Sequence, residues 1–201
     1  MDHYYQTAYV VSYADLRTRE KLMLCLRLLI DENGLRFNNV YIYSKSLYQP
    51  KYQFLQKVLS AIPKVKYFPY RESEDILDPS QARENSIFIF DDVASDKQNK
   101  IKDYFSMGRH KAIDCFYLCQ TYARIPKHLI RDNANFLIVF KQDDLNLRHI
   151  YDDHVGADMS FERFKRMCSE CWKEKYNFLV IDKDRDMDKG RYRKLLDTYI
   201  K

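Results

Sequence analysis

The chain has 201 residues, 46% of them hydrophobic and 15% aromatic, which suits one domain with a sizeable core (residues 1–201) and excludes two comfortable ones. Thirty-four lysines and arginines against 29 acids give a net charge of +5, an excess that permits contact with nucleic acid without demonstrating it. No apolar run approaches the roughly 18 residues of a membrane helix, no secretory signal follows Met1, and five scattered cysteines exclude a disulfide framework, so we expect a soluble, intracellular protein.

Short apolar and aromatic runs alternate with helix-period segments, as in a mostly parallel sheet with helices on both faces. Strands are predicted, in chain order, at residues 8–12, 40–43, 65–68, 87–90, 115–119, 136–140 and 178–181. Helices are predicted at residues 21–33, 51–62, 99–107, 145–152 and 161–172, with a last one at 192–200. The sequence therefore predicts an α/β fold.

Three other segments carry specific expectations. Residues 69–85 contain two prolines and five acids, which predicts a connection across the edge of the sheet. The charge-dense residues 183–193 are predicted to form a solvated turn around Gly190. Cys168 and Cys171 have the spacing of a metal or redox pair, but no second pair accompanies them and both lie in a predicted helix, so we predict no metal there.

The strongest chemical signal is an apolar strand that ends abruptly in two acids, Asp91 and Asp92. Ligands of such sheets bind beyond the carboxyl ends of the strands. In nucleotide hydrolases this is the Walker B element, where the first acid holds the Mg²⁺ shell and the adjacent acid polarises the attacking water. On residues 86–93 alone, a pair of acids that merely opens a loop is an equal alternative.

Two neighbouring segments add polar groups. The next buried strand finishes in Gln120, and an amide there can orient water or sense a terminal phosphate. Gly108 is predicted to end a helix and to expose Arg109, His110 and Lys111, which can neutralise phosphate in their own or a neighbouring subunit. A plain strand end and a solvated basic loop are the respective alternatives.

As an ordered series, these segments resemble the FtsK–HerA-type DNA-packaging ATPases of Maverick/Polinton transposons and large DNA viruses, including poxviruses. The resemblance covers about residues 7–182 and rests on residues 41–47, 49–50, 87–92, 108–110, 117–120, 125–126 and 133–141. It implies a RecA-like P-loop NTPase that works as an oligomeric ring and uses ATP and Mg²⁺ to pump double-stranded DNA into capsids. It makes Asp91 the Mg²⁺ acid, Asp92 the water-activating acid, Gln120 the sensor and Arg109 the leading candidate for a trans-acting arginine.

The family's phosphate-binding loop, G-x-x-x-x-G-K-[ST] or Walker A, is degenerate in this chain. Its glycines let backbone N–H groups approach phosphate oxygens, and no glycine precedes Gly34. Alignment by the following leucine pattern puts Lys21 at the Walker lysine, Leu22 at the hydroxyl, and Asp15 and Glu20 at the two glycines. Two acids and a leucine repel phosphate and deprive Mg²⁺ of a ligand, so Lys21 is better explained as an ordinary charged residue.

The leading hypothesis is a packaging-ATPase homologue in which this loss argues against hydrolysis. Either the loop decayed, or the chain is incomplete at its N-terminus because the gene is truncated or mis-joined; both explanations stay open. The alternative function is a non-catalytic module that keeps the fold for oligomerisation or DNA contact. A phospho-acceptor receiver domain is a weaker alternative, because only Asp15 follows the first strand.

Cofactors and partners follow from the resemblance alone. ATP and Mg²⁺ are the implied cofactors, and double-stranded DNA, further copies of the chain and capsid proteins are the implied partners. Nucleus, cytoplasmic virus factory and virion are equally compatible locations. One group of basic residues is expected to contact the DNA backbone. A solvated helix face is an equally good explanation of this group. Its members are Lys97, Lys100, Lys102, Arg109, His110 and Lys111.

Overall fold

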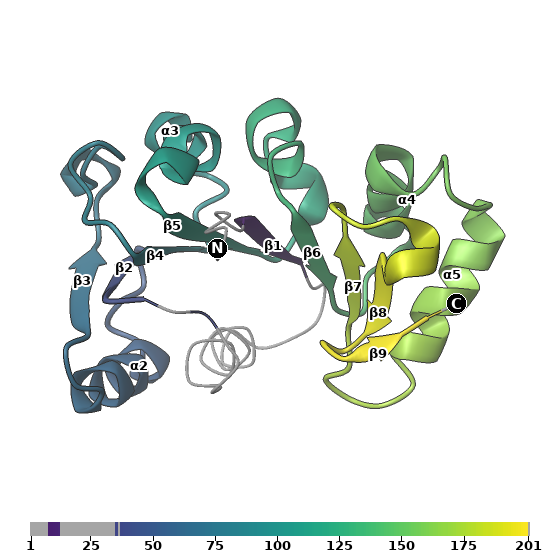
Figure 1. Cartoon of the computed structure of the whole chain (residues 1–201), viewed down its shortest axis with the longest axis horizontal. Helices are drawn as coiled ribbons and strands as arrows, with labels where there is room; N and C mark the ends of the chain where they lie inside the picture. Colours follow the sequence, from purple (N-terminus) through teal and green to yellow (C-terminus); the bar gives the residue numbers. More distant parts are fainter. Residues whose placement is uncertain (1–7, 13–34, 36, 201) are drawn as a thin grey trace.

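The computed structural model describes residues 8–12, 35 and 37–200. The predicted helix at 21–33 and Lys21 lie outside these residues. The described residues form a nine-stranded sheet in the order β3-β2-β4-β5-β1-β6-β7-β8-β9 (Figure 1). The strands are β1 (Ala8–Ser12), β2 (Asn39–Tyr43), β3 (Lys66–Tyr70), β4 (Ser86–Asp91), β5 (Ile113–Cys119), β6 (Phe136–Val139), β7 (Leu179–Asp182), β8 (Tyr192–Lys194) and β9 (Thr198–Tyr199).

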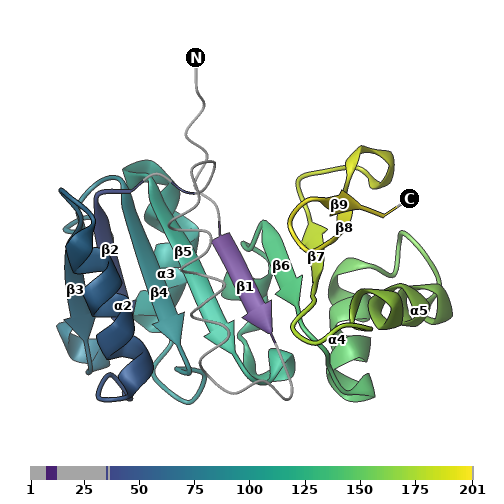
Figure 2. The ribbon, with the colours of Figure 1, turned by 90° about the horizontal axis from the view of Figure 1, so that it is seen from below.

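The strands from β3 to β6 run parallel, and β7, β8 and β9 continue the sheet as an antiparallel extension. Helix α2 (Pro50–Ala61) lies on one face, and α3 (Asn99–Met107) lies on the other (Figure 2). Helices α4 (Asp144–His154) and α5 (Phe161–Cys171) pack on the same face as α3. The predicted α/β fold with helices on both faces is confirmed.

Alternation of side chains along each strand builds two separate cores. Phe88 and Phe90 of β4 point toward α3, whereas Ile87 and Ile89 point toward α2. Every residue of β4 is buried, as expected of a parallel strand covered on both faces. The strands are apolar throughout because side chains on both faces of the sheet are buried. All seven predicted strands are present, with ends that agree within one or two residues.

The predicted helix at residues 192–200 is wrong, because these residues form β8 and β9. Strand β8 forms antiparallel hydrogen bonds with the edge of β7 that β6 does not occupy. Gly190, at φ +90°, allows the turn before β8. Hydrogen bonding to an existing edge outweighs the local helical pattern of a short segment.

One further expectation is confirmed and another needs correction. Helix α3 ends at Met107 with Gly108 as its C-cap, as predicted, and a separate 3₁₀ turn at Gly108–Lys111 (η2) follows and ends at Ala112, at φ +48°. Residues 183–193 are not simply a solvated turn, because two arginines at their end pair with carboxylates. Arg191 Nε lies 2.6 Å from Asp158 Oδ2, and the guanidinium of Arg193 pairs with buried Asp182.

The predicted cysteine pair lies on α5. Cys168 and Cys171 are 0% and 1% exposed, and burial raises the pKa of Cys171 to about 11. Such thiols stay protonated at neutral pH and pack as small apolar groups. Within the described ranges, no helix has the length and apolarity that crossing a lipid bilayer requires.

Candidate functional site

The predicted acids lie at the carboxyl edge of the parallel part of the sheet. Asp91 is the last residue of β4 and is in register with Leu118 of β5, while Ser12 at the end of β1 is in register with Cys119. Strand β5 therefore separates β4 from β1, and all three end at the same edge (Figure 2). The placement of residues 87–90 in a central parallel strand near β1 and β5 is confirmed. Ligand sites of α/β sheets form at this edge.

Asp91 is fully buried and bound from α2. Lys51 Nζ lies 2.7 Å from Asp91 Oδ2, and the hydroxyl of Tyr52 lies 2.8 Å from the same oxygen. The side chain of Lys51 is only 7% exposed, and its ammonium group lies 4.2 Å from the ring centroid of Tyr52. The carboxylate at the end of β4 thus already has a cation and a hydroxyl group as partners.

The start of α2 explains this arrangement. Pro50 occupies the first turn, where its missing N–H has no cost and its fixed φ suits a helix. Tyr52, Leu55 and Leu59 form the buried face of α2, which draws the first turn down over the end of β4. Burial, followed by the negative charge of Asp91, raises the pKa of Tyr52 above its ordinary value, so Tyr52 remains a neutral hydroxyl.

Asp92 has a different environment, because it is exposed and has φ +60°. Its backbone N–H donates to Leu118 O at 3.1 Å, which extends the β4–β5 ladder by one residue. Aspartate tolerates the left-handed region better than most residues. Asp92 therefore presents its carboxylate to solvent at the sheet edge, one residue after a carboxylate that is buried.

Tyrosines from two strands hold the loop that follows Asp92. Tyr43 of β2 donates to Asp96 Oδ2 at 2.7 Å, and burial together with Asp96 raises the pKa of Tyr43. Gln98 donates to Val93 O at 2.7 Å and accepts from the hydroxyl of Tyr117 of β5 at 3.1 Å. The loop is thus fixed by polar contacts rather than by packing alone.

The other predicted site residues stand in different relations to this edge. Gln120 follows β5 and is exposed, so β5 brings it to the same edge as the two acids. The backbone of Arg109 lies in η2, and its side chain is outside the described part of the structure. The predicted roles of Asp91, Asp92, Gln120, Arg109 and Lys21 stay predictions.

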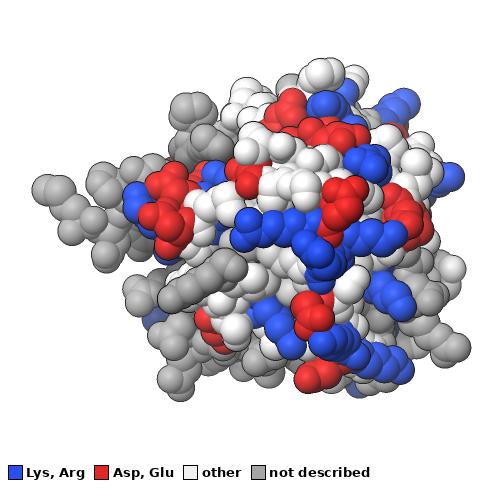
Figure 3. All heavy atoms as spheres, turned by 90° about the vertical axis from the view of Figure 1, so that its right-hand side faces the viewer, with Lys and Arg blue, Asp and Glu red and all other residues white. Residues whose placement is uncertain are grey.

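Two of the lysines expected to meet DNA are engaged within the protein. Lys97 Nζ lies 3.2 Å from Glu74 Oε1, and Lys100 donates to Glu74 O at 3.1 Å. Both contacts fasten the 3₁₀ turn η1 (Ser73–Asp75) to the start of α3. The face beside α5 and β9 intersperses basic and acidic side chains (Figure 3).

In its described conformation, the carboxylate of Asp91 is engaged by two protein groups that an Mg²⁺ ion would have to displace. Mg²⁺ requires oxygen ligands in near-octahedral geometry, whereas Oδ2 is shared by an ammonium group and a hydroxyl group and the side chain is buried. In the described part of the chain, no group of three histidine, cysteine or acidic side chains is arranged to hold a metal ion.

Sequence analysis missed Lys51 and Tyr52. Both follow Gln49 and Pro50, which contributed to the family resemblance. A lysine in the first turn of a helix nevertheless looks like a solvated charge, and its partner is 40 residues away. The one signal in the sequence was the helical spacing of apolar residues in 51–62, which indicated that one face of this helix packs on the sheet.

Comparisons with known proteins agree with this geometry. The sequence profile of the family described as Poxvirus A32 protein matches residues 26–193. The genome-packaging NTPase B204 of Sulfolobus turreted icosahedral virus 2, in complex with sulfate, gives a TM-score of 0.61 at 14% identity, over 89% of this chain and 92% of that one. The same protein with ATP-gammaS gives 0.55 at 13% identity, over 89% and 93%.

More distant proteins share the fold as well. ATPases 2 and 3 of EccC from Thermomonospora curvata give a TM-score of 0.54 at 9% identity, over 100% of this chain and 38% of that one. No curated protein matches the chain. At these identities the solved structures show the fold alone, an α/β fold like that of P-loop packaging ATPases.

Proposed function

Because this chain belongs to the Poxvirus A32 protein family and is a homologue of viral genome-packaging ATPases, we propose that it keeps their fold but has lost ATP hydrolysis. The observation that carries the proposal is the segment that follows β1. Strand β1 ends beside β5 at the same edge as Asp91 and Asp92, where a phosphate loop would have to begin. Residues 13–22 contain no glycine and no serine or threonine after Lys21.

Electrostatics support the loss. When the loop is placed by the leucine pattern that follows it, Asp15 and Glu20 take the places of the two loop glycines. Each would add a side chain where backbone N–H groups must approach phosphate, and a negative charge beside a polyanion. The acids of β4 remain at the right edge, so the metal-binding half of the family's site is retained in sequence while the phosphate-binding half is not.

The proposed partners follow from family membership. The chain contacts double-stranded DNA, assembles as a homo-oligomeric ring, and meets capsid proteins during packaging of a viral or transposon genome. Asp92, Gln120 and Arg109 take the places of the water-activating acid, the sensor and the trans-acting arginine, and Asp91 that of the Mg²⁺ acid. Without hydrolysis, the chain acts as an oligomerisation or DNA-contact module.

Hydrolysis by the purified chain tests the proposal. We expect the chain to hydrolyse ATP no faster than its Asp92→Asn variant, because the sequence of residues 13–22 lacks the glycines that let a backbone wrap phosphates. Turnover that depends on Asp92 would show that this loop binds phosphate without glycines, and would overturn the proposed loss.

Repair of the loop is the complementary test. The combined substitutions Asp15→Gly, Glu20→Gly and Leu22→Thr should tighten the binding of Mg²⁺-ATP in a titration. Removing one carboxylate near bound phosphate is worth on the order of 1 kcal/mol at an effective dielectric near 20. A matched triple variant, Asp15→Asn, Glu20→Gln and Leu22→Thr, removes the charges and adds the same hydroxyl without adding glycines, so it separates electrostatics from backbone access.

A further inference from the structure

We propose that Lys51 is a built-in counter-ion of Asp91, whose ammonium group takes the place of a divalent cation beside the acid at the end of β4. The inference deepens the proposed loss of hydrolysis, because it assigns a cation to the retained acid. It concerns the ground state of the protein without nucleotide, so it is testable without ATP.

Burial distinguishes this ion pair from ordinary surface pairs. The side chains of Lys51 and Asp91 are 7% and 0% exposed, with 2.7 Å between Nζ and Oδ2. Lys45, which pairs with Asp96 nearby, is 58% exposed. An exposed pair contributes little, whereas removing one partner of a buried pair leaves an uncompensated charge in a medium of low dielectric.

Tyr52 extends the pair into a fixed polar chain. Its hydroxyl lies 2.8 Å from Asp91 Oδ2 and 2.7 Å from Ser44 Oγ. A hydroxyl has one proton, and the carboxylate is the stronger acceptor, so Tyr52 donates to Asp91 and accepts from Ser44. Ser44 Oγ in turn lies 3.3 Å from the backbone N–H of Ser46, which donates to it. The chain therefore runs from the β2–α2 loop to Asp91.

A divalent cation at Asp91 has to compete with this arrangement. The ammonium group is attached to α2, so it is present beside the carboxylate at every metal concentration. Displacing it leaves a desolvated lysine without its carboxylate, or requires the first turn of α2 to move, and buried Tyr52 and Leu55 oppose that movement. Metal affinity at Asp91 should therefore be low while Lys51 is in place.

Four variants test the inference: Lys51→Met, Asp91→Asn, the two combined, and Lys57→Met as a control for an exposed lysine of the same helix. The melting temperature of each is measured with EDTA and with millimolar Mn²⁺, and Mn²⁺ binding is followed by electron paramagnetic resonance. Methionine keeps the length of the side chain and removes its charge.

Lys51→Met should lower the melting temperature by roughly 10 °C, as expected when a buried carboxylate loses its lysine partner in a domain of this size. Mn²⁺ should restore part of this loss and bind at least tenfold more tightly than to the wild type. The double variant should regain much of the melting temperature and lose the response to Mn²⁺ that depends on position 91, because no buried carboxylate is left there to neutralise. Lys57→Met should behave like the wild type.

Several results would overturn the inference. They are Mn²⁺ binding by the wild type that disappears in Asp91→Asn, a Lys51→Met variant as stable as Lys57→Met, or losses that simply add in the double variant. If Lys51→Met does not fold, recovery of folding in the double variant would support the inference, and a double variant that also fails to fold beside a folded Asp91→Asn would overturn it. An active wild-type ATPase would refute the proposed loss of hydrolysis, whereas these melting and binding results decide the role of Lys51.

Discussion

At the scale of single residues, left-handed backbone positions determine which side chains the fold accepts. Asp92 adopts φ +60°, a conformation in which asparagine is accommodated as readily as aspartate. The Asp92→Asn control for hydrolysis therefore changes charge without changing backbone preference. Gly190 adopts φ +90°, and a β-carbon there would lie 2.2 Å from the ring of Tyr199. The backbone conformation at 190 therefore favours glycine, and any larger residue would also have to displace the ring of Tyr199.

Gly190→Ala should lower the free energy of unfolding by about 1–2 kcal/mol, the cost of an L-residue in the left-handed region. The ring of Tyr199 is 57% exposed and can turn aside, so the backbone sets the main cost. Urea unfolding measures the change. Gly156→Ala is the matched control, because its φ lies outside that region and its nearest neighbour is 3.6 Å away. Equal losses in the two variants would contradict the explanation.

At the scale of elements, a polar network joins α4 to the irregular segment between β5 and β6. The hydroxyl of Tyr122 lies 2.6 Å from His154 Nε2 and 3.2 Å from Asp153 Oδ2. Asp153 also pairs with Arg131 and, at 2.9 Å, with Lys127. Burial, with help from nearby cations, lowers the pKa of His154 to about 3. The network therefore holds a neutral imidazole between charged groups.

This neutral histidine makes stability depend on pH. The unfolded chain protonates His154 below about pH 6.5 while the folded protein does so only near pH 3, so the contribution is complete above pH 6.5 and declines as the pH falls between these values. Relative to His154→Gln, the wild type should lose about 2 kcal/mol of unfolding free energy between pH 7.5 and pH 5. Denaturant unfolding at both pH values measures the difference.

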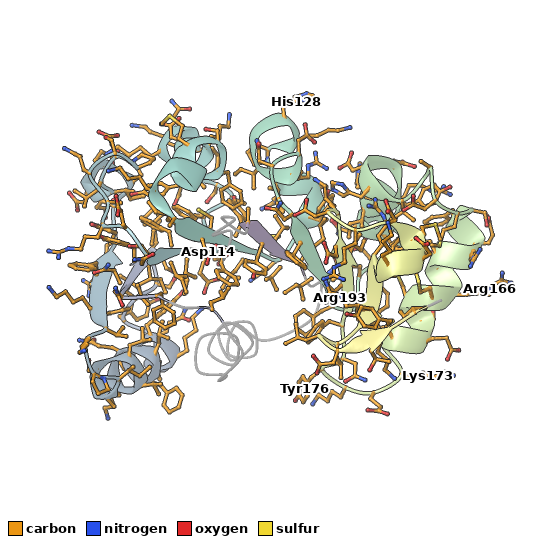
Figure 4. All side chains as sticks on the ribbon, viewed as in Figure 1. Asp114, His128, Arg166, Lys173, Tyr176 and Arg193 are labelled. Carbon is orange, nitrogen blue, oxygen red and sulfur yellow. The ribbon has the colours of Figure 1, made fainter. Side chains whose placement is uncertain are left out.

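His128 provides the control for this prediction. It lies at the outer end of the segment Lys127–Arg131 (η4) and points away from the protein (Figure 4), with its side chain 89% exposed. His128→Gln should therefore keep the pH dependence of the wild type. The same slope in His154→Gln as in the wild type would show that His154 is not held neutral by the fold.

At the scale of the whole molecule, a cluster of aromatic rings on the α3 face of the sheet joins the central strands to α3. Phe88 of β4 stacks on Phe90 with 4.3 Å between ring centroids and on Tyr41 with 5.4 Å, and its ring lies 4.4 Å from that of Tyr104 in α3. These rings link three elements across one face of the sheet. Because β4 has neighbours on both edges, damage to this cluster affects the cooperative unit as a whole.

Phe88→Ala should reduce the free energy of unfolding by about 4 kcal/mol, since the large cavity cannot collapse between stacked rings. Guanidinium unfolding should show a lower midpoint with an unchanged slope. Phe54→Ala on α2, where the side chain is 50% exposed, should cost about 0.5 kcal/mol or less. A small loss at Phe88 would mean that the sheet is not the stabilising core.

The sequence by itself determined what depends on neighbouring residues. Apolar runs located seven strands because parallel strands covered on both faces must be apolar throughout, and Asp91 and Asp92 marked the strand end at the ligand edge. The ordered motifs indicated the family. The structure tests none of the predicted residue roles, and Lys21 lies outside the described residues.

Tertiary structure decided what depends on partners distant in the chain. The segment at 192–200 forms strands because β8 pairs with the edge of β7. Arg191 and Arg193 are largely buried because they pair with Asp158 and Asp182, which are distant in the chain. Lys51 reaches Asp91 across 40 residues only because α2 packs over the end of β4. The strength of an ion pair depends on burial and on the position of its partner, and neither is encoded in the residues next to it.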